Sequence, residues 1–171
     1  INVMIMETKK SKWLVDPAHS EFTFKVKHMM ISTVTGQFGE FSVDVETAGD
    51  DFKDADIYVE VKVDSINTKN NDRDNHLKSD DFFNAEKYPL IRFRSKKFDG
   101  TKLIGDLTIR DVTKEVTLDS EFNGIAVDPY GQTKAGFELT GQINRKEYKL
   151  LWNAVTEAGN VVVSDTVKLG I

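Results

Sequence analysis

The segment Ile57–Val63, with the sequence IYVEVKV, decides the fold because apolar and polar residues alternate along it. A period of two places every second side chain on the same face, which is typical of a half-buried antiparallel strand. Similar alternation occurs in residues 21–28, 91–94, 106–110, 115–122, 137–143 and 161–169. The pattern predicts an all-β protein.

Turn signals separate these segments. Asp99-Gly100 is a strong signal for a two-residue hairpin loop. Asp128-Pro129-Tyr130-Gly131 combines a proline that fixes φ with a glycine that tolerates positive φ. The apolar face also switches near Gly39, which predicts a β-bulge that bends the strand. About eight strands with short connections predict one antiparallel up-and-down barrel.

Residues 65–89 break this pattern because they are polar and do not alternate. Residues 71–78 predict a short capped helix, and Ser79, followed by two aspartates, is a good second N-cap. Pro89 marks the return to a strand. We therefore expect a short helical insertion, at about residues 70–87, that lies as a lid across one end of the barrel.

Composition excludes several classes of protein. The chain has 171 residues, of which 39% are hydrophobic and 30% charged, which suits one globular domain. It lacks cysteine, so disulfides and thiolate chemistry are ruled out. A net charge of −5 with scattered lysines argues against binding of nucleic acid. No apolar stretch is long enough for a transmembrane segment.

The N-terminus shows no basic segment followed by a small-residue cleavage site, so no signal peptide is visible and we expect a cytoplasmic protein. The alternating pattern has not begun in residues 1–11, which we interpret as an N-terminal extension. Residues 12–171 then form one domain, because neither a linker nor an internal repeat divides them.

The sequence holds no pattern that predicts catalysis or a cofactor. The acidic residues 72–81 lack the glycine and the closing glutamate of a calcium loop. The three histidines lack metal-ligand spacing, and no serine lies in a glycine-flanked elbow. Glycine-rich phosphate loops are also missing. We therefore expect no metal, no cofactor and no enzymatic activity.

Three polar residues fall on predicted inner faces: His28, Arg145 and Asp165. A charge on an apolar face must be paired or lie near a wet opening. One interpretation is an ion pair between Arg145 and Asp165 that closes one end of the core. The other is that these groups meet the polar head of a ligand.

From about Trp13 to the C-terminus, the chain resembles the YceI-like polyisoprenoid-binding family. The resemblance rests on residues 13–20, 24–29, 34–38, 65–68, 73–74, 76–79, 81–83, 88–89, 105–109, 112–114 and 116–118, together with Phe93, Ser95, Arg145, Trp152, Asn153 and Asp165. Asp111 stands where the family usually has glycine and Glu115 where it often has proline, both at turn positions.

This resemblance implies a lipocalin-like, extended eight-stranded barrel with a helical insertion. It also implies an elongated apolar pore for isoprenoid or related lipid chains, and often a homodimer. No catalytic residue carries over. The expected function is binding, transport or storage of a polyisoprenoid or similar long-chain fatty lipid.

Two alternatives stay open: a structural or interaction module with a filled barrel, and an enzyme that acts on a lipid-like substrate. Periodicity does not distinguish a packed core from a pore, since inward aromatic side chains serve both. The candidate ligand-binding residues are Phe22, Phe24, Val26, His28, Phe38, Phe82, Phe83, Ile91, Phe93, Leu107, Ile109, Phe122, Phe137, Leu139, Ile143, Arg145, Trp152 and Asp165.

Overall fold

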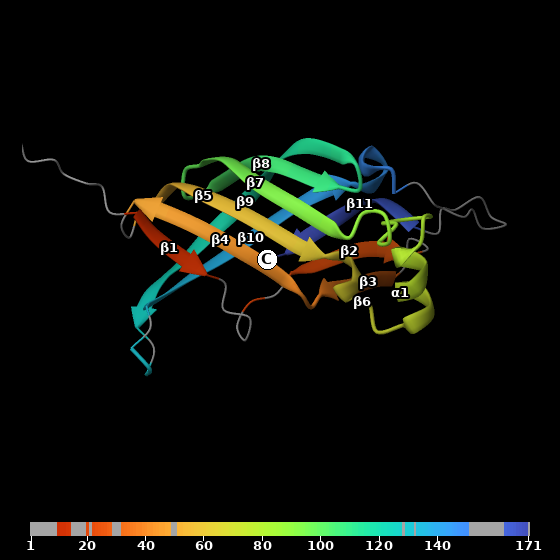
Figure 1. Ribbon diagram of the computed structural model, residues 1–171, viewed down its shortest axis with the longest axis horizontal. Helices are drawn as coiled ribbons and strands as arrows, with labels where there is room; N and C mark the ends of the chain where they lie inside the picture. Colours follow the sequence, from red (N-terminus) through yellow and green to blue (C-terminus); the bar gives the residue numbers. More distant parts are fainter. Residues whose placement is uncertain are drawn as a thin grey trace, which may run out of the picture.

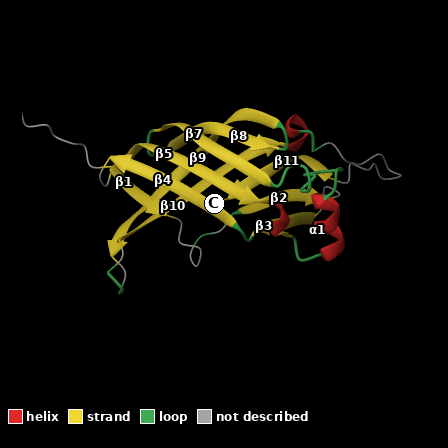
Figure 2. Cartoon of the chain, viewed as in Figure 1, coloured by secondary structure: helices red, strands yellow, loops and turns green. Residues whose placement is uncertain are grey.

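A computed structural model describes residues 10–14, 20, 22–28, 32–48, 51–127, 129–131, 133–150 and 163–170. These residues form one curled antiparallel sheet with the helical elements gathered at one end (Figures 1 and 2). The predicted all-β fold is confirmed. The elements are β1 (Lys10–Leu14), β2 (Thr23–His28), β3 (Ser32–Phe38), β4 (Phe41–Ala48), β5 (Asp51–Lys62), η1 (Val63–Ser65), β6 (Ile66–Asn67), α1 (Asn71–Lys78), β7 (Leu90–Phe98), β8 (Lys102–Ile109), β9 (Val112–Val127), β10 (Thr133–Asn144), η2 (Arg145–Tyr148) and β11 (Val163–Gly170).

The alternation in sequence sets the inner face of the sheet. In β7, Ile91 and Phe93 are buried while Arg92 and Arg94 are exposed. In β8, every second residue from Leu103 onward is buried. The buried faces of these strands meet inside the curl and form one hydrophobic core.

The sheet closes through interrupted strands, and the register differs by two residues between the two sides of each interruption. Eleven strand segments are present in the described part of the chain, against about eight expected strands. Three pairs of consecutive segments can each be counted as one strand: β1 with β2, β3 with β4, and β5 with β6. The pair β3 and β4 lies in the middle, since β2 and β6 pair with β3, and β1 and β5 pair with β4. Counting each pair as one strand gives an eight-stranded circuit that returns from β11 to β2. The barrel is therefore built as predicted, with more breaks than periodicity shows.

The predicted irregularity at Gly39 is the break between β3 and β4. The Gly39 N–H donates to the carbonyl of Ser65 at 3.1 Å, and the Lys62 N–H donates to the carbonyl of Glu40 at 3.0 Å. The inward-facing positions change from even to odd numbers across this break, as expected. Since η1 lies opposite, the two adjacent strands bend together.

The loop between β7 and β8 contains three residues, so the expected two-residue hairpin is wrong. Gly100 adopts a φ of 93°. The Asp99 carboxylate accepts hydrogen bonds from the N–H of Lys102 at 2.7 Å and from the N–H and hydroxyl of Thr101 at 2.8 and 2.9 Å. These bonds favour the charged carboxylate and lower the pKa of Asp99 to about 2.

The insertion contains one helix, not two. The helix α1 spans the predicted residues, and the side chain of Asn70 caps it by accepting from the N–H of Arg73 at 3.0 Å. Ser79, expected to start a second helix, instead ends α1, because its N–H donates to the carbonyl of His76 at 3.1 Å. Turns follow, since Asn84 adopts a φ of 49° that a helix cannot continue.

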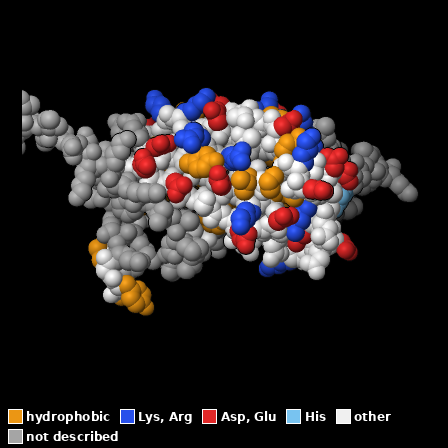
Figure 3. All heavy atoms as spheres, viewed as in Figure 1, with side chains coloured by type: hydrophobic (Ala, Val, Ile, Leu, Met, Phe, Trp, Pro, Cys, Tyr) orange, Lys and Arg blue, Asp and Glu red, His pale blue; other side chains and the backbone are white. Residues whose placement is uncertain are grey.

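The outer surface carries charges of both signs (Figure 3). Lys96 is exposed, and its ammonium lies 3.3 Å from the carboxylate of Asp106 and 3.1 Å from that of Glu115. Both acids raise the pKa of Lys96. The described part of the chain contains no helix that is both long and apolar enough to cross a membrane.

The Asp99 loop predicts a pH-dependent contribution to stability. The pKa of Asp99 is lowered from 3.8 to about 2 in the folded protein. Its carboxylate therefore stabilises the fold above the unfolded pKa, and this contribution is lost as the pH falls from about 4 through about 2. We expect Asp99→Asn to lower the urea midpoint at pH 7 but not at pH 2. Asp64→Asn, at an exposed position in η1, is the control. A pH-independent effect of Asp99→Asn would contradict this assignment.

Candidate functional site

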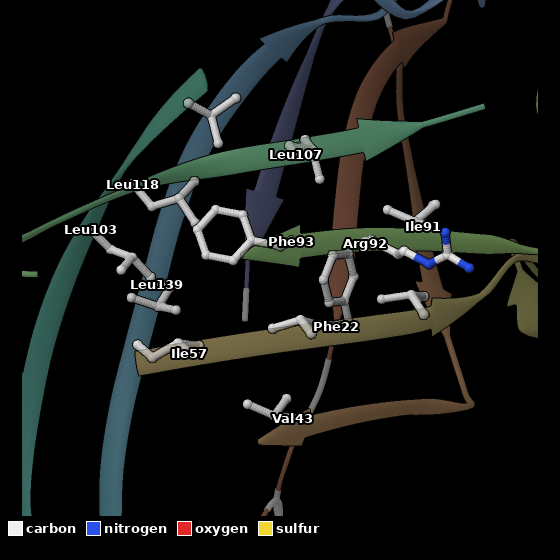
Figure 4. A pocket seen from close by; sticks show the side chains of 13 residues that line it. Phe22, Val43, Ile57, Ile91, Arg92, Phe93, Leu103, Leu107, Leu118 and Leu139 are labelled. Carbon is white, nitrogen blue, oxygen red and sulfur yellow. The ribbon is translucent and has the colours of Figure 1, made fainter. Parts of the chain in front are cut away.

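An apolar cavity of about 60 Å³ lies inside the barrel (Figure 4). Its walls come from β4, β5, β7, β8, β9 and β10, and from the residue before β2. Arg92 is the one charged residue at its edge, and it is exposed. The space suffices for roughly five water-sized groups. The lining residues are Phe22, Val43, Ile57, Val59, Val61, Ile91, Arg92, Phe93, Leu103, Leu107, Val116, Leu118 and Leu139.

Glycines on the inner face make room for aromatic rings beside the wall. A Cβ added at Gly36 would lie 2.2 Å from the ring of its cross-strand partner Phe24. A Cβ added at Gly105 would lie 2.5 Å from the ring of Phe93. Each ring thus occupies the space that a side chain would fill, and it lies against the backbone instead of across the barrel axis.

Most of the predicted ligand-binding residues lie inside the barrel. Phe22, Ile91, Phe93, Leu107 and Leu139 line the cavity. The structure therefore brings distant parts of the chain to one interior, although the role of these residues in binding stays a prediction. The others in the interior are buried Phe24, Phe38, Phe82, Ile109 and Ile143, with half-buried Val26, Phe83 and Phe137 at its margins.

Phe122 was expected on the inner face, and it shares a face with its cross-strand partner Phe137, which packs against the core, but it is not buried. Its side chain is 47% exposed. Its ring stacks on that of Phe137 with centroids 4.8 Å apart. The physical reason for its exposure is that, among the described residues, β9 at Phe122 pairs only with β10, because its ladder with β8 ends at the pair Lys102–Asp119.

Eight cavity residues were missing from the predicted set: Val43, Ile57, Val59, Val61, Arg92, Leu103, Val116 and Leu118. Alternation did mark all of these as inward-facing except Arg92 and Leu103. An apolar cavity inside a barrel is lined mainly by branched aliphatic side chains, which the pattern alone identifies.

Lys114 is a further residue of the inner face that the sequence analysis did not identify. It pairs with buried Leu107, so the two side chains share the inner face of the sheet. Lys114 is nevertheless exposed. Among the described residues, the β9–β10 ladder ends at the pair Asp119–Thr140, so this stretch of β9 is hydrogen-bonded only to β8. A cation thus lies on the inner side of the wall where water reaches it.

Arg145 lies at the helical end of the barrel, in η2. Its side chain is 2% exposed, one guanidinium nitrogen donates to the carbonyl of Leu150 at 2.5 Å, and its charge lies over the ring of Phe82 at 5.9 Å. The register pairs Asn144 with Thr166, which brings the backbones of residues 145 and 165 to the next position. The side chains of His28 and Asp165, and all of Trp152, lie outside the described residues, so the expected ion pair stays a prediction.

The lid is attached at the base of α1 by a buried hydrogen-bond network. The carboxylate of Asp74 accepts from the N–H and the hydroxyl of Thr68 at 2.9 and 2.5 Å. Arg73 donates to the hydroxyl and the carbonyl of Thr68 at 2.8 and 2.7 Å. This network holds the first turn of α1 against the end of β6 and positions the loop that follows the helix.

Arg110 connects that loop to the barrel. Its guanidinium donates to the carbonyls of Asp80, Phe82 and Lys149 at 3.2, 3.0 and 3.2 Å, and it lies 5.6 Å from the ring centroid of Tyr88. Only 14% of its side chain is exposed. The bonds hold Phe82, which is buried, over the helical end of the core.

Of the two departures from the family pattern, Glu115 lies within β9, where it pairs with Asp106, so its expected turn position is wrong. Asp111 lies in the β8–β9 turn. Arg110, not a glycine, takes the left-handed conformation there, with a φ of 55°. Asp111 accepts from the ammonium of Lys149 at 2.9 Å, and Glu115 accepts from that of Lys96 at 3.1 Å. The departures therefore form surface ion pairs, and the hairpin still closes at the pair Ile109–Val112.

The chemistry of the described site is that of apolar contact. The cavity lining contains neither a carboxylate nor a histidine nor a hydroxyl. His76 and Asp81 lie 2.8 Å apart on the lid. Burial raises the pKa of Tyr148 to about 12, so its hydroxyl stays protonated. In the part of the chain that the structure describes, no three His, Asp or Glu side chains gather as metal ligands.

Comparison with known proteins agrees with this architecture. A UPF0312 protein of Staphylococcus aureus is 43% identical over 154 residues, which covers 90% of each chain. The structure of a Campylobacter jejuni YCEI protein is 36% identical, covers 93% of this chain and 94% of that one, and superposes with a TM-score of 0.69.

Two more distant structures share the fold. BcnA of Burkholderia cenocepacia is 21% identical, with a TM-score of 0.74 over 91% of this chain and 96% of that one. A domain from Saccharophagus degradans described as polyisoprenoid-binding is 16% identical, with a TM-score of 0.65 over 95% of each chain. The family model of the YceI-like domain matches residues 13–171. The chain therefore belongs to the YceI-like domain family.

Proposed function

We propose that this protein binds a polyisoprenoid or a similar long-chain apolar lipid inside its barrel, and carries or stores it without chemical change. The observation that supports this proposal is the apolar cavity at the centre of the barrel. The distant relative described as a polyisoprenoid-binding domain shares the fold and agrees with it. Affinity would come from apolar area removed from water, at about 25 cal/mol per Å².

The cavity is smaller than such a ligand requires. Pockets for drug-sized molecules usually measure about 300–1,000 Å³, whereas this one measures about 60 Å³. A chain of several isoprene units therefore needs the aliphatic lining residues to change rotamer. Because Phe24, Phe93 and Leu118 already lie against inner-wall glycines, the movement would fall mainly on Leu139 and Val43.

Uptake of a polyprenol tests the proposal. We expect native mass spectrometry to show a one-to-one adduct with the unmodified protein. Val43→Trp adds bulk to a half-buried lining position, so it should abolish uptake at a stability cost of about 1–3 kcal/mol. Ser42→Trp, on the exposed face of the same strand, is the matched control and should bind normally.

The alternative of a filled barrel predicts a different result. Failure of the unmodified protein to take up the polyprenol, or equal uptake by Val43→Trp, would overturn binding in this cavity. An interaction module would then be the better description. Chemical conversion of the bound lipid would instead favour an enzyme.

We further propose that Lys114 meets the head group of the lipid, because it is exposed and shares the inner face with cavity residues. Exposed ion pairs contribute less than about 1 kcal/mol. Lys114→Gln should therefore weaken binding of a polyprenyl phosphate by about two- to fivefold and leave binding of the corresponding alcohol unchanged, as measured by titration. Lys146→Gln, at an exposed position in η2, is the control. Equal weakening for both lipids would contradict a charge contact.

Arg110 is proposed to hold the lid closed over the bound lipid. Arg110→Met keeps the apolar stem but removes the hydrogen bonds to the lid carbonyls, so we expect a loss of about 1–3 kcal/mol in stability. Amide exchange in residues 79–88 and dissociation of the lipid should both become faster. Arg94→Met, on the exposed outer face, should change neither. Faster amide exchange with unchanged lipid dissociation would show that the lid does not control access.

A further inference from the structure

The described residues expose three large hydrophobic side chains, and all three lie on the β9–β10 hairpin. Phe122 is 47% exposed, Val127 68% and Tyr130 90%. Hydrophobic atoms gather at the tip of this hairpin in Figure 3, and Figure 1 shows the tip at the end of the barrel opposite α1. The apolar surface is therefore remote from the lid.

The hairpin extends beyond the barrel wall. Hydrogen-bonded pairing of β9 with β8 ends at Asp119, and pairing of β10 with β11 begins at Thr140. Residues 120–127 and 133–139 consequently form a ladder only with each other in the part of the chain that the structure describes. The stacked rings of Phe122 and Phe137 lie on this two-stranded ribbon, at its base.

The charge of the hairpin differs from that of the rest of the chain. Between Phe122 and Phe137 the sequence contains one aspartate and one lysine, so this segment is neutral in a chain of net charge −5. At its base, exposed Glu121 and Glu138 lie directly opposite each other. An apolar, neutral tip above two carboxylates fits an uncharged lipid surface, whereas anionic head groups would repel it.

The exposed area is small for a protein partner. An aromatic side chain carries 150–250 Å², so the three exposed side chains offer on the order of 400 Å². A stable protein interface needs about 800 Å² on each partner. A bilayer has no such threshold, because each apolar group that reaches the acyl layer leaves water independently. Tyr130 also suits the interface, since its ring is apolar and its hydroxyl polar.

We propose that the tip of the β9–β10 hairpin docks the protein on the surface of a zwitterionic lipid bilayer. Val127 and Tyr130 enter the head-group region, and the two glutamates stay in water. The lid end of the barrel then faces away from the membrane. This docking goes beyond the proposed lipid carriage and does not depend on it.

The absence of cysteine makes a site-specific probe simple to introduce. Val127→Cys, labelled with a polarity-sensitive fluorophore, is mixed with phosphatidylcholine vesicles that contain no isoprenoid. We expect a blue shift of the label and flotation of the protein with the vesicles. Ser42→Cys, at an exposed position on the barrel wall, carries the same label as the control and should show no shift.

Substitution provides the second measurement. Val127→Ser combined with Tyr130→Ser should lower the partition coefficient by about tenfold or more, and added phosphatidylglycerol should lower it for the unmodified protein. Tyr58→Ser, on the barrel wall, should leave the partition coefficient unchanged.

No flotation, or equal partitioning of the double variant, would overturn the proposal. A label shift that follows protein concentration without vesicles would instead identify a second copy as the partner. Polyprenol uptake, measured separately, distinguishes loss of docking from loss of carriage.

Discussion

The hydrogen-bond ladder of this protein has to close on itself, and the remaining features depend on how it does so. A closed barrel leaves no edge strands along its wall, but it requires strands that tilt and bend. Here two neighbouring strands bend at the same level, at Gly39 and at η1. The bend changes the parity of the inward-facing residues, so the apolar side chains stay inside on both sides of it. Without this change, half of each strand would expose its core face.

Closure is incomplete at two places, which lie at opposite ends of the barrel. Next to η2 the β9–β10 ladder stops, which leaves Lys114 on the inner side but in contact with water. At the other end the same two strands continue past their neighbours and expose an apolar tip. The barrel therefore has two chemically different ends, one covered by a lid that Arg110 holds through charged hydrogen bonds, the other apolar and neutral.

Alternation was sufficient to predict most of the strands, the barrel, the break near Gly39 and the inward direction of most core residues, but not β1 or β6. It failed where direction alone does not decide burial: Phe122 has the parity of a core residue but lies beyond the wall. The second helix expected at Ser79 failed because a capping residue can end a helix as well as start one. The size of the cavity could not be predicted either, since it depends on how rings pack against Gly36 and Gly105 in three dimensions.

The contacts between rings and glycines also determine how far the interior can deform when a bound molecule pushes against it. Phe24 and Phe93 already touch backbone on their outer side, so a guest that pushes on them meets a stiff wall. Close-packed protein interiors have low compressibility. Aliphatic side chains that do not contact a glycine can move aside by changing rotamer, but the rings of Phe24 and Phe93 cannot. A barrel of this kind is expected to discriminate between chains by their cross-section more sharply than by their length, because thickness is resisted at every ring and length only at the two ends.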